Sequence, residues 1–134
     1  MLEDDELRAL KKFLFEHVVD LEEIQILADF QRDAGKGSLT AEEVAALTGL
    51  PVATTRDALQ RLNTRGLLAP TATEPAAYRY AADGAVRASL DRALSEYQAN
   101  PLQVLGLMTA NAIERVRTSA MRAFADSFRI KGPK

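Results

Sequence analysis

Residues 39–70 restrict the fold of this chain more than any other segment. Thr40 followed three residues later by Glu43 has the spacing of a capping box, in which each side chain bonds an unpaired backbone N–H at a helix start. A helix from there ends at Gly49, because glycine readily adopts the left-handed conformation that terminates helices. Pro51 then opens a second helix with its fixed φ. This spacing predicts two helices joined by a tight turn, the layout of a helix-turn-helix.

The apolar spacing predicts which side of each helix is buried. In the first helix we expect the inward residues to be Val44, Ala45 and Leu47. In the second helix we expect them to be Thr55, Ala58, Leu59 and Leu62. Leu50 is expected to fill the corner between the two helices.

Two short β-prone runs follow, residues 67–70 and 78–81, around a loop at 71–77. They predict a β-hairpin in which Pro70 lies at an edge or at a strand end. From about residue 20 to 82 the chain therefore resembles the winged-helix domains of small bacterial regulators of the MarR and PadR type. The residues that carry the resemblance are Thr40 and Glu43, Ala45-Ala46-Leu47, Gly49-Leu50, Arg61-Leu62 and Gly66-Leu67-Leu68. It implies a mainly α fold with a small β-hairpin, DNA binding, transcription regulation and a homodimer.

Three regions are predicted along the chain, in which 47% of the 134 residues are hydrophobic, enough for one core. Residues 1–19 form an acidic N-terminal helix. Residues 20–82 form the winged helix-turn-helix, and residues 83–134 form a C-terminal helical region for dimerisation or interaction.

Further helix starts are predicted from capping residues. Asp20 and Glu23 have the spacing of a second capping box. Asp83 is placed to cap a helix after the hairpin, and Asn100 with Pro101 marks the start of the last helix. The inward residues of the helix after Asp20 are expected to be Leu21, Ile24, Leu27 and Phe30.

The last helix is expected to be long, since residues 101–130 contain one glycine and no proline after the first residue. Thirty helical residues span about 45 Å, too much to pack wholly on a small domain. Apolar and alanine positions repeat along it at helical spacing and form the expected dimerisation surface: Leu105, Met108, Ala112, Val116, Ala120 and Phe124. The alternative is an amphipathic helix folded back over its own domain, either continuous or broken near Ala110-Asn111.

The outward side of the second helix, residues 52–65, is the candidate DNA-reading surface, because a recognition helix presents its N-terminal residues to base edges. Arg56 can pair with guanine O6 and N7, and Gln60 with adenine N6 and N7. The full set of candidate DNA contacts is Thr40, Ala53, Thr54, Arg56, Asp57, Gln60, Arg61 and Arg79.

Several of these candidates suit phosphates better than bases. Thr54, Arg61 and the backbone near the Thr40 cap are placed to fix position on the DNA backbone. The wing loop contains Glu74 but no Lys or Arg, so Arg79 on the returning strand is the basic residue that the hairpin offers.

Charge is spread unevenly behind a net value of −2 and a pI of about 5.5. Residues 1–30 hold nine acidic residues against three basic ones, a net −6. Residues 31–70 are +1, and residues 101–134 hold six basic residues against two acidic ones, a net +4. Local charge decides the field near a surface, so the acidic segment is expected to face away from DNA or to pair with the basic C-terminus.

Composition also excludes several functions. The chain has no cysteine and a single histidine, His17, so it offers neither a thiolate metal site nor a pair of histidines. We find no catalytic constellation and expect neither enzyme activity nor a cofactor. No apolar run approaches a membrane span, and the acidic N-terminus lacks the apolar region of a signal peptide, which predicts a cytoplasmic protein.

Two other functions fit the same sequence. One is a winged helix that binds a protein partner through the C-terminal helix and does not bind DNA. The other is a ligand-sensing regulator with a pocket between the domain and the C-terminal helices. The tail is either core and a frayed terminus or a basic-aromatic docking segment, with Phe124, Phe128, Ile130, Arg122, Arg129, Lys131 and Lys134.

Overall fold

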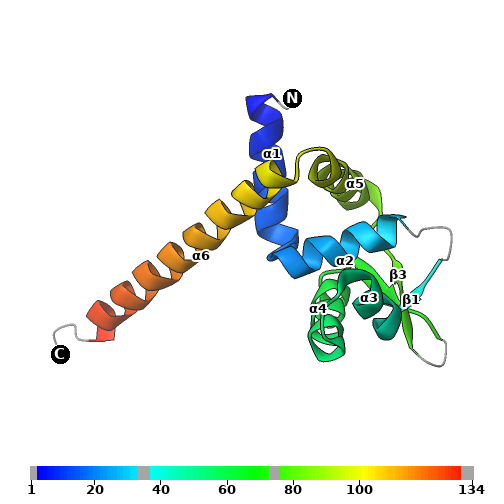
Figure 1. Ribbon diagram of the computed structural model, residues 1–134. Coiled ribbons are helices and arrows are strands. Elements are labelled where there is room, and N and C mark those ends of the chain that lie inside the picture. Colours follow the sequence, from blue (N-terminus) through cyan, green and yellow to red (C-terminus); the bar gives the residue numbers. More distant parts are fainter. Residues whose placement is uncertain (1–2, 33–36, 73–75, 131–134) are drawn as a thin grey trace.

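The computed structural model describes residues 3–32, 37–72 and 76–130, with side chains of the last helix described to residue 127 (Figure 1). Glu74 and the tail side chains Phe128, Arg129, Ile130, Lys131 and Lys134 lie outside the described parts. The elements in chain order are α1 (Asp4–His17), α2 (Leu21–Arg32), β1 (Leu39–Thr40), α3 (Ala41–Thr48), α4 (Val52–Thr64), β2 (Leu68–Pro70), β3 (Ala77–Tyr80), α5 (Gly84–Ala99) and α6 (Pro101–Ile130). The predicted mainly α fold with a small β element is confirmed.

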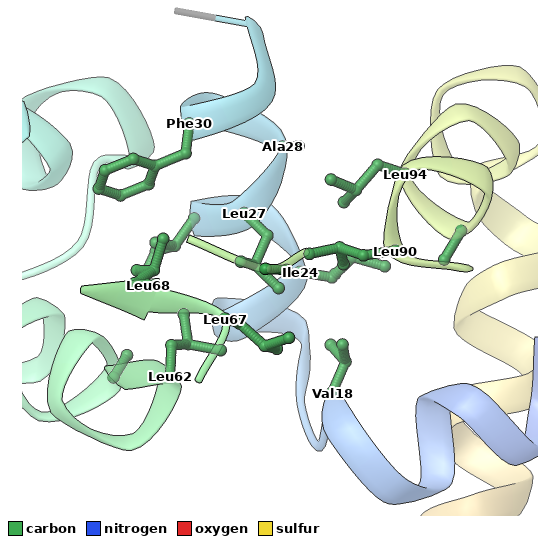
Figure 2. Packing of buried hydrophobic residues seen from close by; sticks show 14 of the residues in the cluster. Val18, Ile24, Leu27, Ala28, Phe30, Leu62, Leu67, Leu68, Leu90 and Leu94 are labelled. Carbon is green, nitrogen blue, oxygen red and sulfur yellow. The ribbon is translucent and has the colours of Figure 1, made fainter. Parts of the chain in front are cut away.

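The hydrophobic core is built around α2, which lies between α4 with β2 on one side and α5 on the other (Figure 2). Ile24 and Leu27 of α2 are fully buried, and so are Leu62 of α4 and Leu90 of α5. Full burial of one such side chain stabilises the fold by about 1.5–3 kcal/mol. The core therefore fixes α4 against the body through its inner side.

Two residues predicted to face inward are exposed. In α3 the buried residues are Ala41, Val44 and Ala45, and Leu47 falls outside that stripe with 51% of its surface exposed. Leu21 is 44% exposed, because Glu23 and not Leu21 turns inward in the first turn of α2.

The helix-turn-helix formed by α3 and α4 is confirmed in detail. The Glu43 N–H donates to Thr40 Oγ1 at 3.1 Å, and the Thr40 N–H donates to Glu43 Oε1 at 2.9 Å, which completes the capping box. Gly49 ends α3 with a φ of 80°, in the region that favours glycine. Buried Thr55 donates through Oγ1 to the Pro51 carbonyl at 2.9 Å, which ties the first turn of α4 together.

The wing is part of a three-stranded antiparallel sheet with the order β1-β3-β2. Pro70 lies at the end of the edge strand β2, opposite Tyr78, as predicted. The sequence pattern does not predict strand β1, because this strand has only two residues before the α3 cap. The Tyr80 hydroxyl donates to Asp91 of α5 at 2.9 Å. Burial first, and then this bond, raises the pKa of Tyr80 well above its ordinary value.

Two predicted caps differ from expectation. The Glu23 N–H donates to Asp20 Oδ1 at 3.0 Å, but the Glu23 carboxylate accepts from the Val19 N–H at 2.8 Å and not from the Asp20 N–H. The second capping box is thus half formed. The Glu23 carboxylate also accepts hydrogen bonds from Arg61 of α4 and from Arg65, directly after α4. Asp83 precedes α5 without making a side-chain cap bond.

The last helix, α6, is continuous over its 30 residues, so the alternative of a break near Ala110-Asn111 is wrong. Its first part packs on α1 and α5, where Val104 and Met108 are buried. Asn111 is buried and its amide donates to the Lys11 carbonyl of α1 at 3.0 Å. Beyond that point α6 projects away from the body, and its far end lies well separated from the sheet (Figure 1).

Candidate nucleic-acid interface

The outward side of α4 is a polar surface on a helix whose inner side is held by the core. Ala53, Arg56, Asp57 and Gln60 are exposed, and Thr54 is half-buried. The inner residues Thr55, Ala58, Leu59 and Leu62 are buried as predicted. The structure therefore places five of the predicted DNA contacts on one accessible surface.

Arg56 lies in this surface but is paired within the chain. Its Nη2 is 2.7 Å from Oε2 of Glu42 in the first turn of α3, and both side chains are more than half exposed. The pKa of Glu42 is below its ordinary value, mainly because its carboxylate accepts a hydrogen bond from the Glu42 backbone N–H. The hydrogen bond from Arg56 lowers the pKa further. Exposed ion pairs contribute little, because water and salt screen them, so Arg56 can exchange this carboxylate for a phosphate or a base edge.

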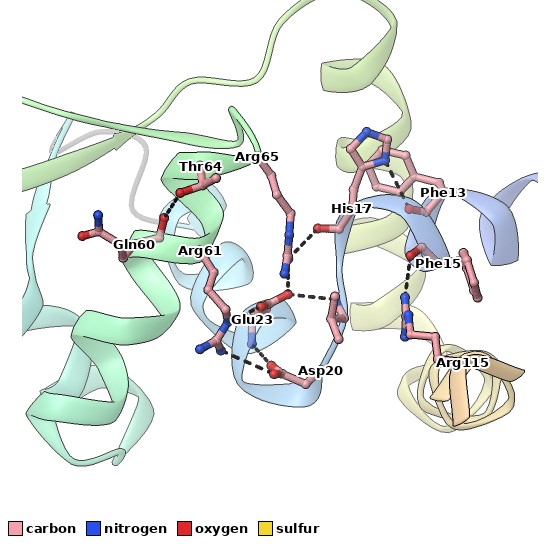
Figure 3. Close-up of polar contacts among 11 residues, drawn as sticks. Phe13, Phe15, His17, Asp20, Glu23, Gln60, Arg61, Thr64, Arg65 and Arg115 are labelled. Atoms are coloured by element: carbon pink, nitrogen blue, oxygen red, sulfur yellow. Dashed lines mark hydrogen bonds and ion pairs between the residues drawn. The ribbon is translucent and has the colours of Figure 1, made fainter. Parts of the chain in front are cut away.

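Arg61 points towards the body and not along the outward surface. Its Nε is 2.8 Å from Oε2 of Glu23, and its Nη2 is 3.4 Å from Oδ2 of Asp20 (Figure 3). Proximity to Glu23 raises the pKa of Arg61 above its already high value. Arg61 is predicted to contact a DNA phosphate, but its guanidinium already pairs with two carboxylates of its own chain.

Glu23 is the centre of this cluster and is fully buried. It accepts hydrogen bonds from Arg61, from Arg65 and from the Val19 N–H. Burial alone raises the pKa of Glu23, but the bonds from Arg65 and Arg61 outweigh burial and leave the pKa below the ordinary 4.5. The carboxylate is therefore ionised at neutral pH.

This pKa predicts how stability depends on pH. A carboxylate whose pKa is lower in the folded state stabilises the fold fully above its unfolded pKa, and that contribution is lost as the pH falls through the folded pKa. We expect the stability difference between the wild type and Glu23→Gln to be largest near pH 6 and to shrink below pH 4.5. Urea unfolding of both proteins from pH 6 to pH 3 measures it, and a difference that stays constant contradicts this prediction.

The remaining predicted DNA contacts, Thr40 and Arg79, lie outside α4, at the start of α3 and on β3. The Thr40 hydroxyl is half-buried and accepts the capping bond from Glu43, so its position is fixed at the start of α3. Arg79 is exposed on β3. Its neighbour Tyr80 instead faces α5, where the Arg87 guanidinium lies 4.4 Å from the ring centre.

The predicted dimerisation residues divide into two groups. Met108 is buried in the chain's own core, and Leu105 packs partly against it. Ala112, Val116, Ala120 and Phe124 are exposed, together with Ile113 and Met121. The reason is that α6 extends beyond the body: residues 116–127 are all exposed, whichever side of the helix they are on.

Sequence reasoning missed Glu23 and Arg65 as a site. The sequence pattern marks Glu23 only as a capping residue, and Arg65 follows the last residue of α4. Glu23 lies 38 positions from Arg61 and 42 from Arg65 along the chain. The one local indication of this site is a glutamate at a position of α2 that faces inward.

Other features bear on the excluded or alternative functions. Within the described ranges no group of three or more His, Cys, Asp or Glu side chains is placed to hold a metal. Among the described helices, none combines the length and apolar character needed to span a membrane.

An open pocket of about 360 Å³ lies between α2, α3 and α5, where the ligand-sensing alternative places an effector. Its lining includes Gln25, Asp29, Arg32, Leu47 and Tyr97.

These elements define a winged helix-turn-helix protein with an N-terminal helix and a long C-terminal helix. No protein-family model matches the sequence, and no curated protein matches it significantly. Among solved structures, the chain is similar to the structure of a MarR family protein from Bacillus stearothermophilus. The TM-score is 0.49 and the identity 18%, over 93% of this chain and 86% of that chain. The winged helix-turn-helix is identified here from the chain's own elements and strand register.

Proposed function

We propose that the protein is a DNA-binding transcription regulator that reads a pseudo-palindromic site as a homodimer. The observation that carries this proposal is the outward side of α4, which is accessible and polar while its inner side is fixed in the core. A recognition helix needs this combination, because its side chains must reach base edges from a rigid support.

Within this proposal the side chains have different tasks. Arg56 and Gln60 read guanine and adenine edges in the major groove. Thr54, Arg79 and the backbone at the Thr40 cap contact phosphates, which fix position without reading sequence. Arg61 is assigned to the internal cluster with Glu23, since its guanidinium is held there.

The homodimer is proposed to form through the distal part of α6. Ile113, Val116 and Met121 are 57%, 70% and 66% exposed, and water-exposed apolar rows of this kind mark interaction surfaces. The net charges of residues 1–30 and 101–134 are opposite in sign, which favours contact between the first helix of one copy and the last helix of the other.

The test is selection from a random duplex pool, followed by titration of the enriched duplex at roughly 50 and 200 mM salt. We expect an enriched palindrome and an affinity that falls with salt. Arg56→Ala is expected to weaken binding by about 1–3 kcal/mol, and to relax specificity at one position of each half-site.

Arg8→Ala is a matched control for Arg56→Ala, because Arg8 also forms an exposed ion pair, with Asp5 on α1. It is expected to leave DNA affinity unchanged. A pool that shows no enrichment, and no binding at low salt, refutes the proposal. The protein-interaction module would then be the function to test.

A further inference from the structure

The C-terminal end of α1 receives arginines from two different helices. The last carbonyl groups of a helix have no partner within it. Here the Phe15 carbonyl accepts a hydrogen bond from Arg115 of α6, and the His17 carbonyl accepts one from Nη1 of Arg65 at 3.1 Å (Figure 3). Cations are favoured at this end of a helix, because the helix dipole is negative there.

Each of the two guanidinium groups is held at a second point. Arg65, directly after α4, also donates to the buried carboxylate of Glu23. The Arg115 guanidinium lies over the Phe15 ring, 4.5 Å from its centre. Both bonds of Arg65 come from Nη1, so this atom is fixed between two acceptors, while Arg115 is fixed by its hydrogen bond and by its contact with the ring.

The junction lies on the path between the reading helix and the projecting helix. The α6 helix packs on α1 and α5, while α4 packs on α2, α3 and β2. Helix α6 is therefore connected to α4 by two routes, one through α1 and the turn between α1 and α2, and one through α5 and α2. Arg115 and Arg65 connect the end of α1 to the two helices, and Arg61 of α4 also pairs with Asp20 in the turn itself.

We infer that Arg65 and Arg115 are positioning residues that set the angle between α4 and α6, and thereby the spacing of the DNA half-sites. The spacing part of this inference rests on the proposed function. In a dimer joined through α6, the angle between α6 and α4 fixes where the two recognition helices lie. Half-sites lie about one helical turn apart, roughly 10 base pairs, so an error in that angle misplaces one half-site.

The angle can be measured without DNA. The chain has no cysteine, so Thr64→Cys at the end of α4 and Thr118→Cys on distal α6 provide two spin-label sites on exposed residues. Labelled chain is diluted with excess unlabelled chain, and the distance distribution is recorded by pulsed electron paramagnetic resonance. We expect one narrow distribution in the otherwise unaltered chain, and a broader or shifted one with Arg115→Met.

Arg65→Lys is the second variant, because it keeps the positive charge beside Glu23, but its ammonium ends one bond short of Nη1, the atom that donates to both Glu23 and the His17 carbonyl. We expect it to fold and to broaden the distribution as Arg115→Met does. Arg117→Met is the matched control, since Arg117 is exposed on the same helix and pairs only loosely with Glu114, at 4.0 Å. Unchanged distributions in both Arg65→Lys and Arg115→Met overturn the inference.

The consequence for DNA is measured with duplexes that carry the selected half-sites at varied spacings. The wild type and Arg117→Met are expected to lose about tenfold in affinity when the spacing changes by one base pair, as for one misplaced base contact. Arg115→Met is expected to accept neighbouring spacings while its half-site sequence stays the same. An altered distance distribution with an unchanged spacing preference overturns the DNA part. If the wild type enriches no DNA, the proposed function fails, and the distance measurement still decides whether the junction positions α4.

Discussion

Glu23→Ala is expected to lower the free energy of unfolding by about 3 kcal/mol. Removing one member of a buried ion pair leaves its partners without a counter-charge and costs roughly 3–5 kcal/mol. Here the lower end applies, because the Arg61 side chain is 40% exposed and water can partly solvate it. The Val19 N–H also loses its acceptor. Urea unfolding at pH 7 measures the change.

Glu16→Ala is the control for this measurement, because Glu16 is an exposed glutamate on α1. A surface change of this kind is expected to stay within about 0.5 kcal/mol. Replacing Glu23, Arg61 and Arg65 together with leucine or methionine is expected to recover most of the loss, since apolar substitutes carry no charge to be solvated. Equal small losses for Glu23→Ala and Glu16→Ala would contradict a role for the cluster.

Val116→Asp is expected to convert the proposed dimer largely to monomer and to reduce affinity for a full palindrome by more than a hundredfold. Val116 is 70% exposed on the distal part of α6, between the exposed residues Ile113 and Met121. An aspartate there brings two like charges towards each other at a two-fold interface, where residues face the same patch of the other copy. Sedimentation equilibrium measures the mass, and titration with one and two half-sites measures the loss of joint binding.

Thr118→Asp is the matched control, since it places the same charge on the same stretch of α6. A residue two positions further along a helix is rotated by about 200° around the helix axis. The side chain at position 118 therefore points away from the side chain at position 116. We expect Thr118→Asp to remain dimeric. A chain that is already monomeric at micromolar concentration before substitution would remove α6 as the dimerisation surface.

The features predicted correctly from the sequence are those that depend on neighbours in the chain. The Thr40–Glu43 capping box, the end of α3 at Gly49 and the edge position of Pro70 each follow from a few adjacent residues. The length of α6 follows from the absence of proline after its first residue and from its single glycine, Gly106.

Other features depend on how the elements pack together, which a local pattern does not contain. The spacing of Leu47 predicts an inward position, but the inner stripe of α3 follows Ala41, Val44 and Ala45 instead. Met108 and Phe124 belong to one apolar row in the sequence, but Met108 packs in the core and Phe124 lies on the exposed part of α6 that extends beyond the body. The pairing of Arg61 with Glu23 depends on how α4 is placed against α2, which only the assembled core determines.

The pairing of Arg56 with Glu42 has a consequence for how the proposed regulator searches a chromosome. On random DNA, phosphates must compete with a carboxylate that already lies 2.7 Å from the guanidinium. Phosphate binding drives non-specific association with DNA. Because the guanidinium must first leave Glu42, the net free energy of its contact with a phosphate is smaller. The carboxylate is thus a weak competitor for the Arg56 guanidinium, because water and salt screen an exposed ion pair. At the correct site the same pair must open for the bidentate contact to guanine, so its small, screened cost lowers specific and non-specific affinity alike and leaves their ratio unchanged.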